Sequence, residues 1–372
     1  MKILIATPLY PPDDGGPATR ARQIEVAFPL QGVEVSVVSF SHFRHYPKGI
    51  SHLRYAIALW RAARDADVIY ALDPVSVGFP SAVVSRLTRT PLVVCIVGDY
   101  AWEQGTQRAG VKENLDEFVQ KTAYPPLVRF LRSVQCWVAE TAVRVIVPSH
   151  YLERIISTWG VMAKKIAVIY NAFDPHMTTE NREHIRERLK FNGRAIISVG
   201  RAVPWKGFVV LMDAVSDLRE EFPDVTLLIA GSGDMTEYVV HAQKNGYAFV
   251  RFVGLLPHDT LMEHIRAADC FALNTGYEGL SYLLLEAMAL GTPIVTTRVG
   301  GNTELLEEGR GLLVEYNNRA SLARELRTVL GQPEAAVTRA LTAKEFVSTF
   351  TLSRMVEESL GVLREAAKHQ HS

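Results

Sequence analysis

The sequence predicts an α/β protein in which two doubly wound, parallel-sheet domains face each other across a cleft. Short apolar segments of strand length alternate with longer segments of helical composition, which is the pattern of repeated βαβ units. This alternation occurs twice, and a polar, charged stretch near the middle of the chain separates the two series. A chain of 372 residues is also too long for one ordinary hydrophobic core, so two domains are expected.

The first series begins with Lys2–Thr7, a near-continuous apolar run that suits a strand buried on both faces of a parallel sheet. A loop follows, and then a helix from Pro17 to about Gln31, which Gly32 ends. Residues 1–170 are therefore predicted to form the first domain. Its further strands are expected at Val33–Phe40, Val68–Leu72, Leu92–Val97, Val143–Pro148 and Ile166–Ile169.

Residues 171–192 contain no apolar segment of strand length, so we expect them to link the two domains. The second domain is predicted at residues 193–350, and residues 351–372 are expected to form a C-terminal helix that crosses back to the first domain. The expected strands are Ala195–Gly200, Val225–Gly231, Val250–Val253, Asp269–Asn274, Ile294–Thr297 and Gly311–Val314. The last helices are expected at Glu334–Thr349 and Leu352–Lys368, where apolar residues recur at helical spacing.

Composition indicates a folded, cytoplasmic protein. The chain is 48% hydrophobic and 22% charged, and its net charge is zero, although the first half is basic and the second acidic. No apolar run approaches the ~18 residues that span a bilayer, and the first residues lack a signal-peptide layout. Cys95, Cys136 and Cys270 lack CxxC spacing and lie in apolar surroundings, so we expect buried, reduced thiols with neither a disulfide nor a zinc site.

Ligands of doubly wound sheets bind beyond the carboxyl ends of the strands, so the loops that follow strands are the candidate sites. The loop after the first strand contains Gly15 and Gly16, and glycines let the backbone approach a phosphate closely. A plain surface turn is the alternative. The glycine spacing is not GxGxxG and no acid follows at the distance that a dinucleotide ribose needs, which disfavours NAD binding.

In the second half, Gly200–Gly207 (GRAVPWKG) places Arg201 and Lys206 between a strand and a helix. Two cations at one site would stabilise a diphosphate leaving group, although solvated surface cations are the alternative. Two weaker signals lie at the ends of the next two strands. They are the glycine-rich turn AGSGD, which contains Gly231, and the FVG sequence, in which Val253 and Gly254 present backbone groups suited to a base edge.

Residues 274–286 (NTGYEGLSYLLLE) are predicted to form a strand end, a glycine-bearing turn and the start of a helix, which is expected at Tyr282–Leu290 and ends at Gly291. The turn is expected to direct the free amides of Ser281–Leu284 outward, because the first amides of a helix have no partner within it. Glu278 would lie on the turn and Glu286 about one helical turn inside. The two carboxylates would then flank a spot suited to a phosphate with a sugar at each end, unless they are only partners of the helix dipole.

These motifs, together with YPPDDGG near the start and GTPIVTTRVGGNTE after the second glutamate, resemble the retaining glycosyltransferases of the GT-B fold, family 4. The resemblance covers essentially the whole chain, and both domains would then be Rossmann-like. It implies that Arg201 and Lys206 bind the donor diphosphate. It further implies that Glu286 bonds the nucleotide ribose and that Glu278 contacts the transferred sugar.

The resemblance also implies roles for backbone groups around the donor. The amides of Ser281, Tyr282 and Leu283 would meet the distal phosphate, and Gly279 and Leu280 would also belong to the donor-binding site. From the first domain, Gly15 and Gly16 would approach the same phosphate. Gly231, Val253 and Gly254 would frame the nucleotide.

The first half departs from the family pattern at one position. Many members carry a histidine after the fourth strand, whereas this turn is Val97–Glu103 (VGDYAWE) and has none. Asp99 is the substitute candidate, to bond a sugar hydroxyl or orient an acceptor. A structural role as a helix cap is the alternative. Trp102 and Glu103 are expected to line an acceptor pocket.

The function implied is transfer of a hexose, with retention, from a UDP- or GDP-sugar to a hydroxyl of a cell-envelope glycan, a glycolipid or a small glycoside. No cofactor or metal is expected to be obligatory. The Asp65–Ala66–Asp67 sequence is a DxD match, but it joins a helix to the start of a strand. The alternatives are a GT-B epimerase, a phosphorylase, or a catalytically inactive protein that binds a nucleotide-sugar.

Two basic, aromatic stretches are candidates for peripheral contact with the inner face of a membrane. His42–Arg64 and Tyr124–Trp137 both place apolar residues at helical spacing among lysines and arginines. The alternative is that these apolar faces pack on the sheet. Nucleic acid is not expected as a partner, because the overall charge is balanced and no recognition motif is present.

Overall fold

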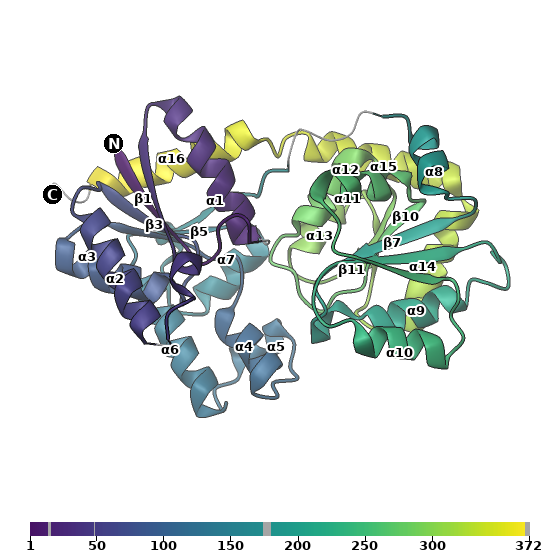
Figure 1. The fold of residues 1–372 in the computed structure, drawn as a ribbon, viewed down its shortest axis with the longest axis horizontal. Coiled ribbons are helices and arrows are strands. Elements are labelled where there is room, and N and C mark those ends of the chain that lie inside the picture. The colour runs from purple at the N-terminus through teal and green to yellow at the C-terminus, as the bar shows by residue number, and fades with distance from the viewer. Residues whose placement is uncertain (14–15, 48, 174–179, 369–372) are drawn as a thin grey trace. The chain divides into compact units, whose positions relative to one another are not determined.

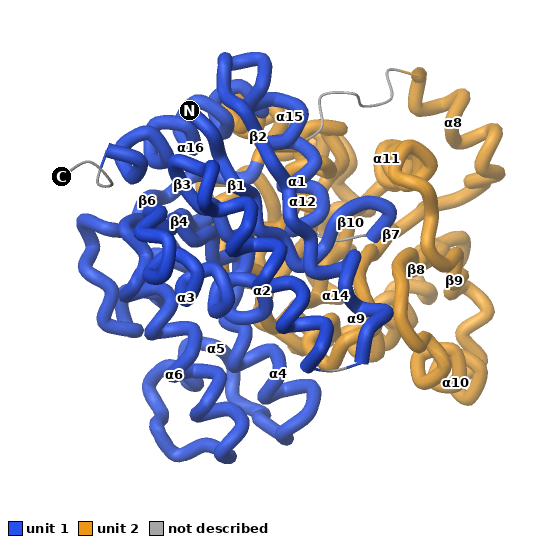
Figure 2. Tube along the Cα trace, turned by 60° about the vertical axis from the view of Figure 1, so that its left-hand side comes forward, with its two compact units in different colours: residues 1–171, 352–372 blue, residues 172–351 orange. Residues whose placement is uncertain are grey.

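The structure, a computed structural model, describes residues 1–13, 16–47, 49–173 and 180–368. The chain forms two compact units (Figure 2). Unit 1 comprises Met1–Asn171 together with Leu352–Ser372, and unit 2 comprises Ala172–Thr351. Gly15, one of the two glycines expected near a phosphate, lies outside the described residues.

Unit 1 is built on a parallel sheet of six strands in the order β2-β1-β3-β4-β5-β6. All six predicted strands are confirmed, within two residues at each end. Their bounds are β1 Lys2–Thr7, β2 Glu34–Ser39, β3 Val68–Ala71, β4 Leu92–Cys95, β5 Arg144–Val147 and β6 Ile166–Val168. The central strands are apolar throughout because helices cover both faces of the sheet (Figure 1).

The helices of unit 1 connect these strands in the manner of βαβ units. Their bounds are α1 Gly16–Ala27, α2 Ile50–Ala63, α3 Gly78–Thr88, α4 Tyr100–Arg108, α5 Leu115–Gln120, α6 Pro126–Thr141, α7 His150–Ser157 and α16 Leu352–Lys368. The last helix reaches this unit from the far end of the chain and packs against α1, β3, β4 and β5. Its apolar face is buried there, at Met355, Val356, Leu360 and Leu363.

A buried arginine connects α1 to the two places where the chain leaves and re-enters unit 1. Arg20 is only 1% exposed. Its guanidinium donates to the Tyr70 hydroxyl (3.2 Å), to Oδ1 of Asn171 (3.2 Å) and to Oγ of Ser359 in α16 (3.4 Å). Because a buried cation is costly unless it is hydrogen-bonded, these contacts help to hold α16 in one position.

Unit 2 contains a second parallel sheet of six strands, in the order β12-β11-β10-β7-β8-β9. The six strands predicted for this half are confirmed. Their bounds are β7 Ala195–Val199, β8 Thr226–Ala230, β9 Val250–Gly254, β10 Cys270–Leu273, β11 Ile294–Thr297 and β12 Leu312–Val314. The helices are α8 Arg182–Leu189, α9 Phe208–Ser216, α10 Thr236–Lys244, α11 His258–Ala267, α12 Tyr282–Leu290, α13 Gly301–Leu306, α14 Arg319–Gly331 and α15 Pro333–Val347.

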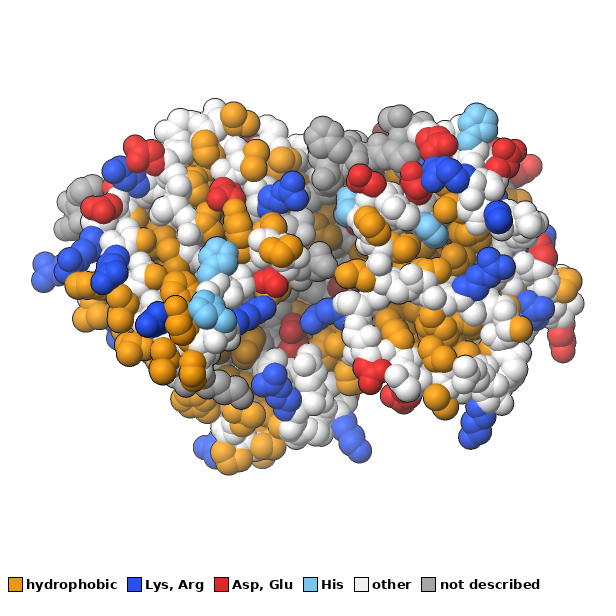
Figure 3. Space-filling model, viewed as in Figure 1, with side chains coloured by type: hydrophobic (Ala, Val, Ile, Leu, Met, Phe, Trp, Pro, Cys, Tyr) orange, Lys and Arg blue, Asp and Glu red, His pale blue; other side chains and the backbone are white. Residues whose placement is uncertain are grey.

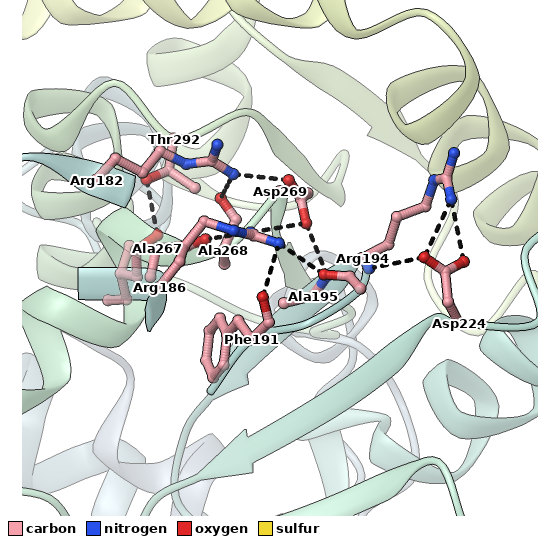
Figure 4. Close-up of polar contacts among 12 residues, drawn as sticks. Arg182, Arg186, Phe191, Arg194, Ala195, Asp224, Ala267, Ala268, Asp269 and Thr292 are labelled. Atoms are coloured by element: carbon pink, nitrogen blue, oxygen red, sulfur yellow. Dashed lines mark hydrogen bonds and ion pairs between the residues drawn. The ribbon is translucent and has the colours of Figure 1, made fainter. Parts of the chain in front are cut away.

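Helix α8 differs from the linker expected at residues 171–192, because it is part of unit 2. Figure 4 shows that two of its arginines point toward the carboxylate of Asp269. Arg182 donates to Oδ1 of Asp269 (2.6 Å), and Arg186 donates to Oδ2 (3.1 Å), which also accepts the Ala195 amide (2.8 Å). More than 80 residues separate the arginines from Asp269, so local composition could not reveal the pairing.

The cysteines are free, with Cys95 and Cys270 buried and Cys136 only partly buried. Burial raises the pKa of the Cys136 thiol to about 11. Within the described ranges, no helix is both long enough and apolar enough to cross a membrane.

Candidate functional site

The loops at the carboxyl ends of the unit 2 strands carry most of the predicted site residues. In this sheet β7 and β10 are neighbours, and the chain proceeds from β7 toward β8 on one side and from β10 toward β11 on the other. That reversal of strand order is the switch point at which doubly wound sheets bind ligands. The loop with Arg201 and Lys206 follows β7, and the turn with Glu278 follows β10.

The loop after β7 is held against the loop after β8. The amide of Gly200 donates to the Ala230 carbonyl (3.0 Å), and that of Ala202 donates to the Ser232 carbonyl (2.8 Å). Gly231 has a φ of +142°, and a Cβ there would overlap the Gly200 carbonyl. Only glycine fits this approach, so the AGSGD signal marks a point where two loop backbones meet.

Lys206 and Glu278 form an ion pair between Nζ and Oε1, with side chains 12% and 16% exposed. The structure thus brings together a predicted diphosphate ligand and the predicted sugar contact. The side chain of Arg201 is exposed, and no hydrogen bond or ion pair joins that side chain to another residue in the described ranges. One of the two predicted cations is therefore paired with a carboxylate, and the other points to solvent.

The side chain of Asn274 joins three loops of the site by hydrogen bonds, a role that the sequence did not reveal. Its Nδ2 donates to the Gly207 carbonyl (2.8 Å) and to Oδ1 of Asn317 (3.0 Å). Its Oδ1 accepts the Asn317 amide (3.1 Å). The loops after β7, β10 and β12 are thereby joined through one nearly buried amide side chain.

The turn after β10 rests on two glycines of the next loop. Gly300 has a φ of +56°, and a Cβ on it would overlap the carbonyl of Glu278. A Cβ on Gly301 would overlap the carbonyl of Gly279. The VGGN sequence thus supports the backbone that carries Glu278, which explains two glycines for which the sequence alone indicated no function.

Helix α12 begins at Tyr282, as predicted, with Ser281 as its N-cap. Oγ of Ser281 accepts the Leu284 amide (3.4 Å), so the expectation that the amides of Ser281–Leu284 are all free is wrong for Leu284. No hydrogen bond joins the amides of Ser281 and Leu283 to another described residue. These two donors and the positive end of the helix dipole provide an anion site.

Glu286 has an unpredicted partner at the start of α11. Nε2 of His258 lies 2.9 Å from Oε1 of Glu286, and the glutamate side chain is 9% exposed. The contact fixes the orientation of the carboxylate in the wall of the site. A possible signal was the position of His258, just beyond β9 and therefore at the same edge of the sheet.

The remaining predicted positions of unit 2 also lie at this edge. Val253 is half-buried near the end of β9, and Gly254 is exposed with a φ of +71°. The carbonyl of Gly254 accepts the Gly231 amide at 2.9 Å. The loops that follow β7, β8 and β9 are therefore connected in series.

In unit 1, Gly16 is the first residue of α1 at the carboxyl end of β1. Asp99 is the N-cap of α4, and its Oδ1 accepts the Trp102 amide (2.9 Å) and Nε2 of Gln135 (2.9 Å). Burial raises the pKa of the Asp99 carboxyl, and these bonds oppose the rise. At 1% exposure, Asp99 would reach a sugar only if its neighbours moved. The helix-cap alternative matches this geometry.

Trp102 is also buried, and its Nε1 donates to the Glu113 carbonyl at 2.8 Å. Sequence reasoning missed Asp73 and Tyr100, which follow the neighbouring strands β3 and β4. Oδ1 of Asp73 accepts the Val75 amide (2.8 Å) and the Ser76 hydroxyl (2.9 Å). Burial raises the pKa of both Asp73 and Tyr100. Unlike Asp99, both side chains are only partly buried at this edge of the sheet.

Within the described residues, no three His, Cys, Asp or Glu side chains are grouped as a metal-ligand set. The DxD match lies at the amino end of β3, where Oδ2 of Asp67 accepts the Lys2 amide at 2.7 Å. That end of the sheet is opposite to the candidate sites.

Two family models account for nearly the whole chain. The model described as "Glycosyl transferase 4-like domain" matches residues 4–172, and "Glycosyl transferases group 1" matches residues 181–345. The chain belongs to glycosyltransferase family 4. The boundary between the two matches falls where the chain passes from unit 1 to unit 2.

Among curated members of this family, the chain is 28% identical over 283 residues to a glycogen synthase of Mycobacterium tuberculosis. That match covers 75% of this chain and 64% of the relative, so the chain spans less than two thirds of the relative's length. A second relative, the putative glycosyltransferase YtcC of Bacillus subtilis, is 25% identical over 344 residues, with 88% of this chain and 76% of the relative covered.

Solved structures place this family 4 chain in the GT-B fold. HepE of Anabaena, crystallised with UDP-glucose, has a TM-score of 0.79 at 22% identity, covering 98% of this chain and 100% of that one. Sucrose-phosphate synthase of Thermosynechococcus elongatus has a TM-score of 0.81 at 20% identity, with 98% of each chain covered. The predicted fold class is therefore confirmed.

Proposed function

We propose that the chain is a retaining glycosyltransferase that moves a hexose from a UDP- or GDP-sugar to an acceptor hydroxyl. One observation carries the proposal. At the switch point of unit 2, Lys206, Glu278 and the start of α12 meet at one sheet edge, with the exposed Arg201 on the same loop as Lys206. A cation, a carboxylate and free helix amides together match the chemistry of a sugar joined to a diphosphate.

In the proposed mechanism the anomeric bond loosens as negative charge develops on the leaving diphosphate. Arg201, Lys206 and the amides of Ser281 and Leu283 stabilise that charge, because they are positioned before the reaction begins. Glu286 bonds the ribose hydroxyls, and Glu278 accepts hydrogen bonds from the transferred sugar. The acceptor attacks the face from which the diphosphate leaves, so configuration is retained, and no step requires a metal ion.

Before the donor binds, Lys206 and Glu278 are paired with each other. When the diphosphate arrives, it offers Lys206 a second anionic partner beside the carboxylate. Glu278 can then turn its free acceptor positions toward the sugar hydroxyls. A donor analogue with a diphosphate but no sugar would therefore contact Lys206 and leave Glu278 without a sugar hydroxyl to bind.

For the acceptor we propose a cell-envelope glycan, a glycolipid or a small glycoside, bound at the carboxyl edge of the unit 1 sheet. Asp73 and Tyr100 are partly exposed side chains at that edge. Asp99 then acts as a positioning residue, because it caps the helix that begins with Tyr100. Gly15 and Gly16 are proposed to approach the distal phosphate, and the enzyme is proposed to work on the cytoplasmic side of a membrane.

The ligands and names of similar proteins support the donor class. HepE was crystallised with UDP-glucose and also with UDP, and several curated relatives are named as synthases or transferases of sugars. These names describe the relatives. They make UDP and UDP-glucose the first ligands to test.

The test is a melting-temperature titration with UDP, GDP and ADP, followed by their sugar conjugates in the presence of EDTA. A ligand at about 100 times its dissociation constant adds about 2.7 kcal/mol to the free energy of unfolding. We expect one nucleotide to stabilise the protein and its sugar conjugate to stabilise it further. An NMR assay of the anomeric configuration of the product then tests retention.

Other outcomes would replace the proposal. Stabilisation without turnover on any acceptor would favour an inactive nucleotide-sugar-binding protein. Conversion of the donor sugar without an acceptor would favour an epimerase. If no nucleotide stabilises the protein, the donor site assigned to unit 2 is wrong.

A further inference from the structure

Three neighbouring helices of unit 1 expose apolar side chains in regular stripes. Leu53 is 62% exposed in α2, Leu87 is 71% exposed in α3, and Phe130 is 63% exposed in α6. The stripes recur at helical spacing, so each occupies one face of its helix. Their members are Ile50, Leu53 and Ile57 in α2, Phe79, Val83 and Leu87 in α3, and Leu127 and Phe130 in α6.

The three stripes belong to one part of unit 1, because α2 packs against α3 and α3 packs against α6. Figure 3 shows hydrophobic side chains gathered over the region of α2 and α3. We call the eight exposed apolar residues and the arginines of these helices the α2–α3–α6 surface. Monomeric proteins rarely expose an apolar patch of several neighbouring large side chains unless it has a partner.

Packing on the sheet does not account for these side chains, because other residues of the same helices fulfil that role. Tyr55 and Leu59 of α2 are fully buried, as is Ala82 of α3. Val128 and Val138 of α6 are buried in the same way. Each helix therefore has one face in the core and a second apolar face directed outward.

The three helices carry mostly positive charge. Within their bounds the only acidic residue is Glu140, near the end of α6. The basic residues are Arg54, Arg61, Arg86, Arg129 and Arg132, and Arg64 and Arg89 follow α2 and α3 directly. Some of these arginines lie over aromatic rings, with Arg64 at 3.7 Å from the Trp60 ring centre and Arg86 at 4.9 Å from that of Trp137.

We propose that the α2–α3–α6 surface binds the face of an anionic lipid bilayer. Exposed Leu, Ile and Phe side chains enter the boundary between head groups and acyl chains, while arginines contact lipid phosphates. A second copy of the chain fits less well, because an isologous contact would set two basic surfaces against each other. The proposal does not depend on sugar transfer. Sequence composition indicated α2 and α6, and the fold adds α3 between them.

Sedimentation with lipid vesicles tests this inference without any donor or acceptor. The intact chain is mixed with vesicles of phosphatidylcholine alone and with vesicles that also contain phosphatidylglycerol. We expect binding to the second type only, weakening as salt is added. Each arginine near an anionic surface contributes about fivefold in affinity, so Arg54→Glu with Arg61→Glu should lower binding by at least ~25-fold.

The apolar stripes are tested by Leu53→Glu with Leu87→Glu, which should abolish vesicle binding. Val337→Glu with Leu341→Glu is the matched control, since these α15 residues of unit 2 are 51% and 59% exposed. The control should bind vesicles as the unchanged chain does. Circular dichroism and nucleotide-induced stabilisation report whether each variant remains folded.

Four results would overturn the inference. Equal binding to neutral vesicles would remove the role of charge, and equal binding by the Leu53/Leu87 variant would remove the role of the stripes. A concentration-dependent dimer, measured by light scattering and abolished by the same substitutions, would assign the surface to self-association. Absence of binding to either vesicle would also contradict it, whatever the outcome for sugar transfer.

Discussion

Lys206 and Glu278 form an ion pair across 72 residues of sequence, and it joins the loop after β7 to the turn after β10. Both side chains are largely buried, so each carries a desolvation cost that the other offsets. The pair therefore has a structural and a chemical role. Substitutions can separate the two roles, because stability and donor binding respond differently to the loss of one charge.

Lys206→Ala should lower kcat/KM by about 100- to 1,000-fold, the usual effect of losing one preorganised donor to a developing charge. It should also cost about 1–3 kcal/mol of folding free energy, because Glu278 is left without its partner. Adding Glu278→Gln should recover part of that free energy and none of the activity. Steady-state kinetics and chemical denaturation measure the two effects. Lys244→Ala, in exposed α10, is the control and should change neither.

His258→Ala should raise the KM for the donor on the order of tenfold and leave kcat nearly unchanged. The reason is that Glu286 loses the contact that orients it, and a ribose contact acts equally in the ground state and the transition state. His258→Gln keeps a donor group and should recover part of the affinity. His184→Ala, at an exposed histidine of α8, is the control. A fall in kcat with an unchanged KM would contradict the assignment.

Gly300→Ala should disrupt donor binding, because its Cβ would overlap the Glu278 carbonyl and push the turn away. Gly309→Ala is the matched control. It has a similar positive φ, +78° against +56°, but a Cβ there meets no atom within 4 Å. Both variants place a Cβ on a backbone with positive φ and should be destabilised, Gly300→Ala more so, because φ +56° with ψ −141° is a conformation that essentially only glycine adopts. Only Gly300→Ala should lose nucleotide-induced stabilisation, and an equal loss in both would show that the turn does not need this support.

Asp99→Asn should change the pH dependence of stability. The pKa of Asp99 is raised in the folded state, so its contribution to stability is most favourable at low pH and declines as pH rises through its ordinary pKa. The melting temperature of the variant, relative to the unchanged chain, should therefore increase as pH rises above the ordinary carboxyl pKa, until Asp99 is ionised in the folded state as well. Asp217→Asn should show the opposite trend, at and below the ordinary carboxyl pKa, because a hydrogen bond from Arg319 lowers the pKa of Asp217 and its stabilising contribution is lost as pH falls. The same slope in both variants would refute the interpretation.

The sequence predicted every strand of the two sheets because each is a short apolar segment with turn residues at its ends. Helix α12 was predicted at its observed bounds, since Ser281 precedes it and Gly291 ends it. Helix α8 was missed as an element of unit 2. Its mean composition is polar, and Ile185 is its only fully buried residue.

The candidate site was predicted as a set of loops, and the contacts within it were not. Loop positions follow from a general rule about the carboxyl ends of parallel strands. The partners of Asn274, Glu286 and Lys206 come from other loops, and only the strand order brings them together. Asp99 shows the converse, since one residue type suits both a sugar contact and a helix cap, and only its burial favours the cap.

The return of α16 to unit 1 has a consequence for the order in which the protein folds during synthesis. Unit 2 is continuous, so it can fold as soon as its own residues leave the ribosome. Unit 1 must wait, because the sites that receive Met355, Leu360 and Leu363 stay uncovered until all of unit 2 has been translated. At ~5–20 residues per second, the delay is on the order of ten seconds or more. The nascent first half therefore exposes apolar surface for that interval and is a natural client for chaperones that bind during translation.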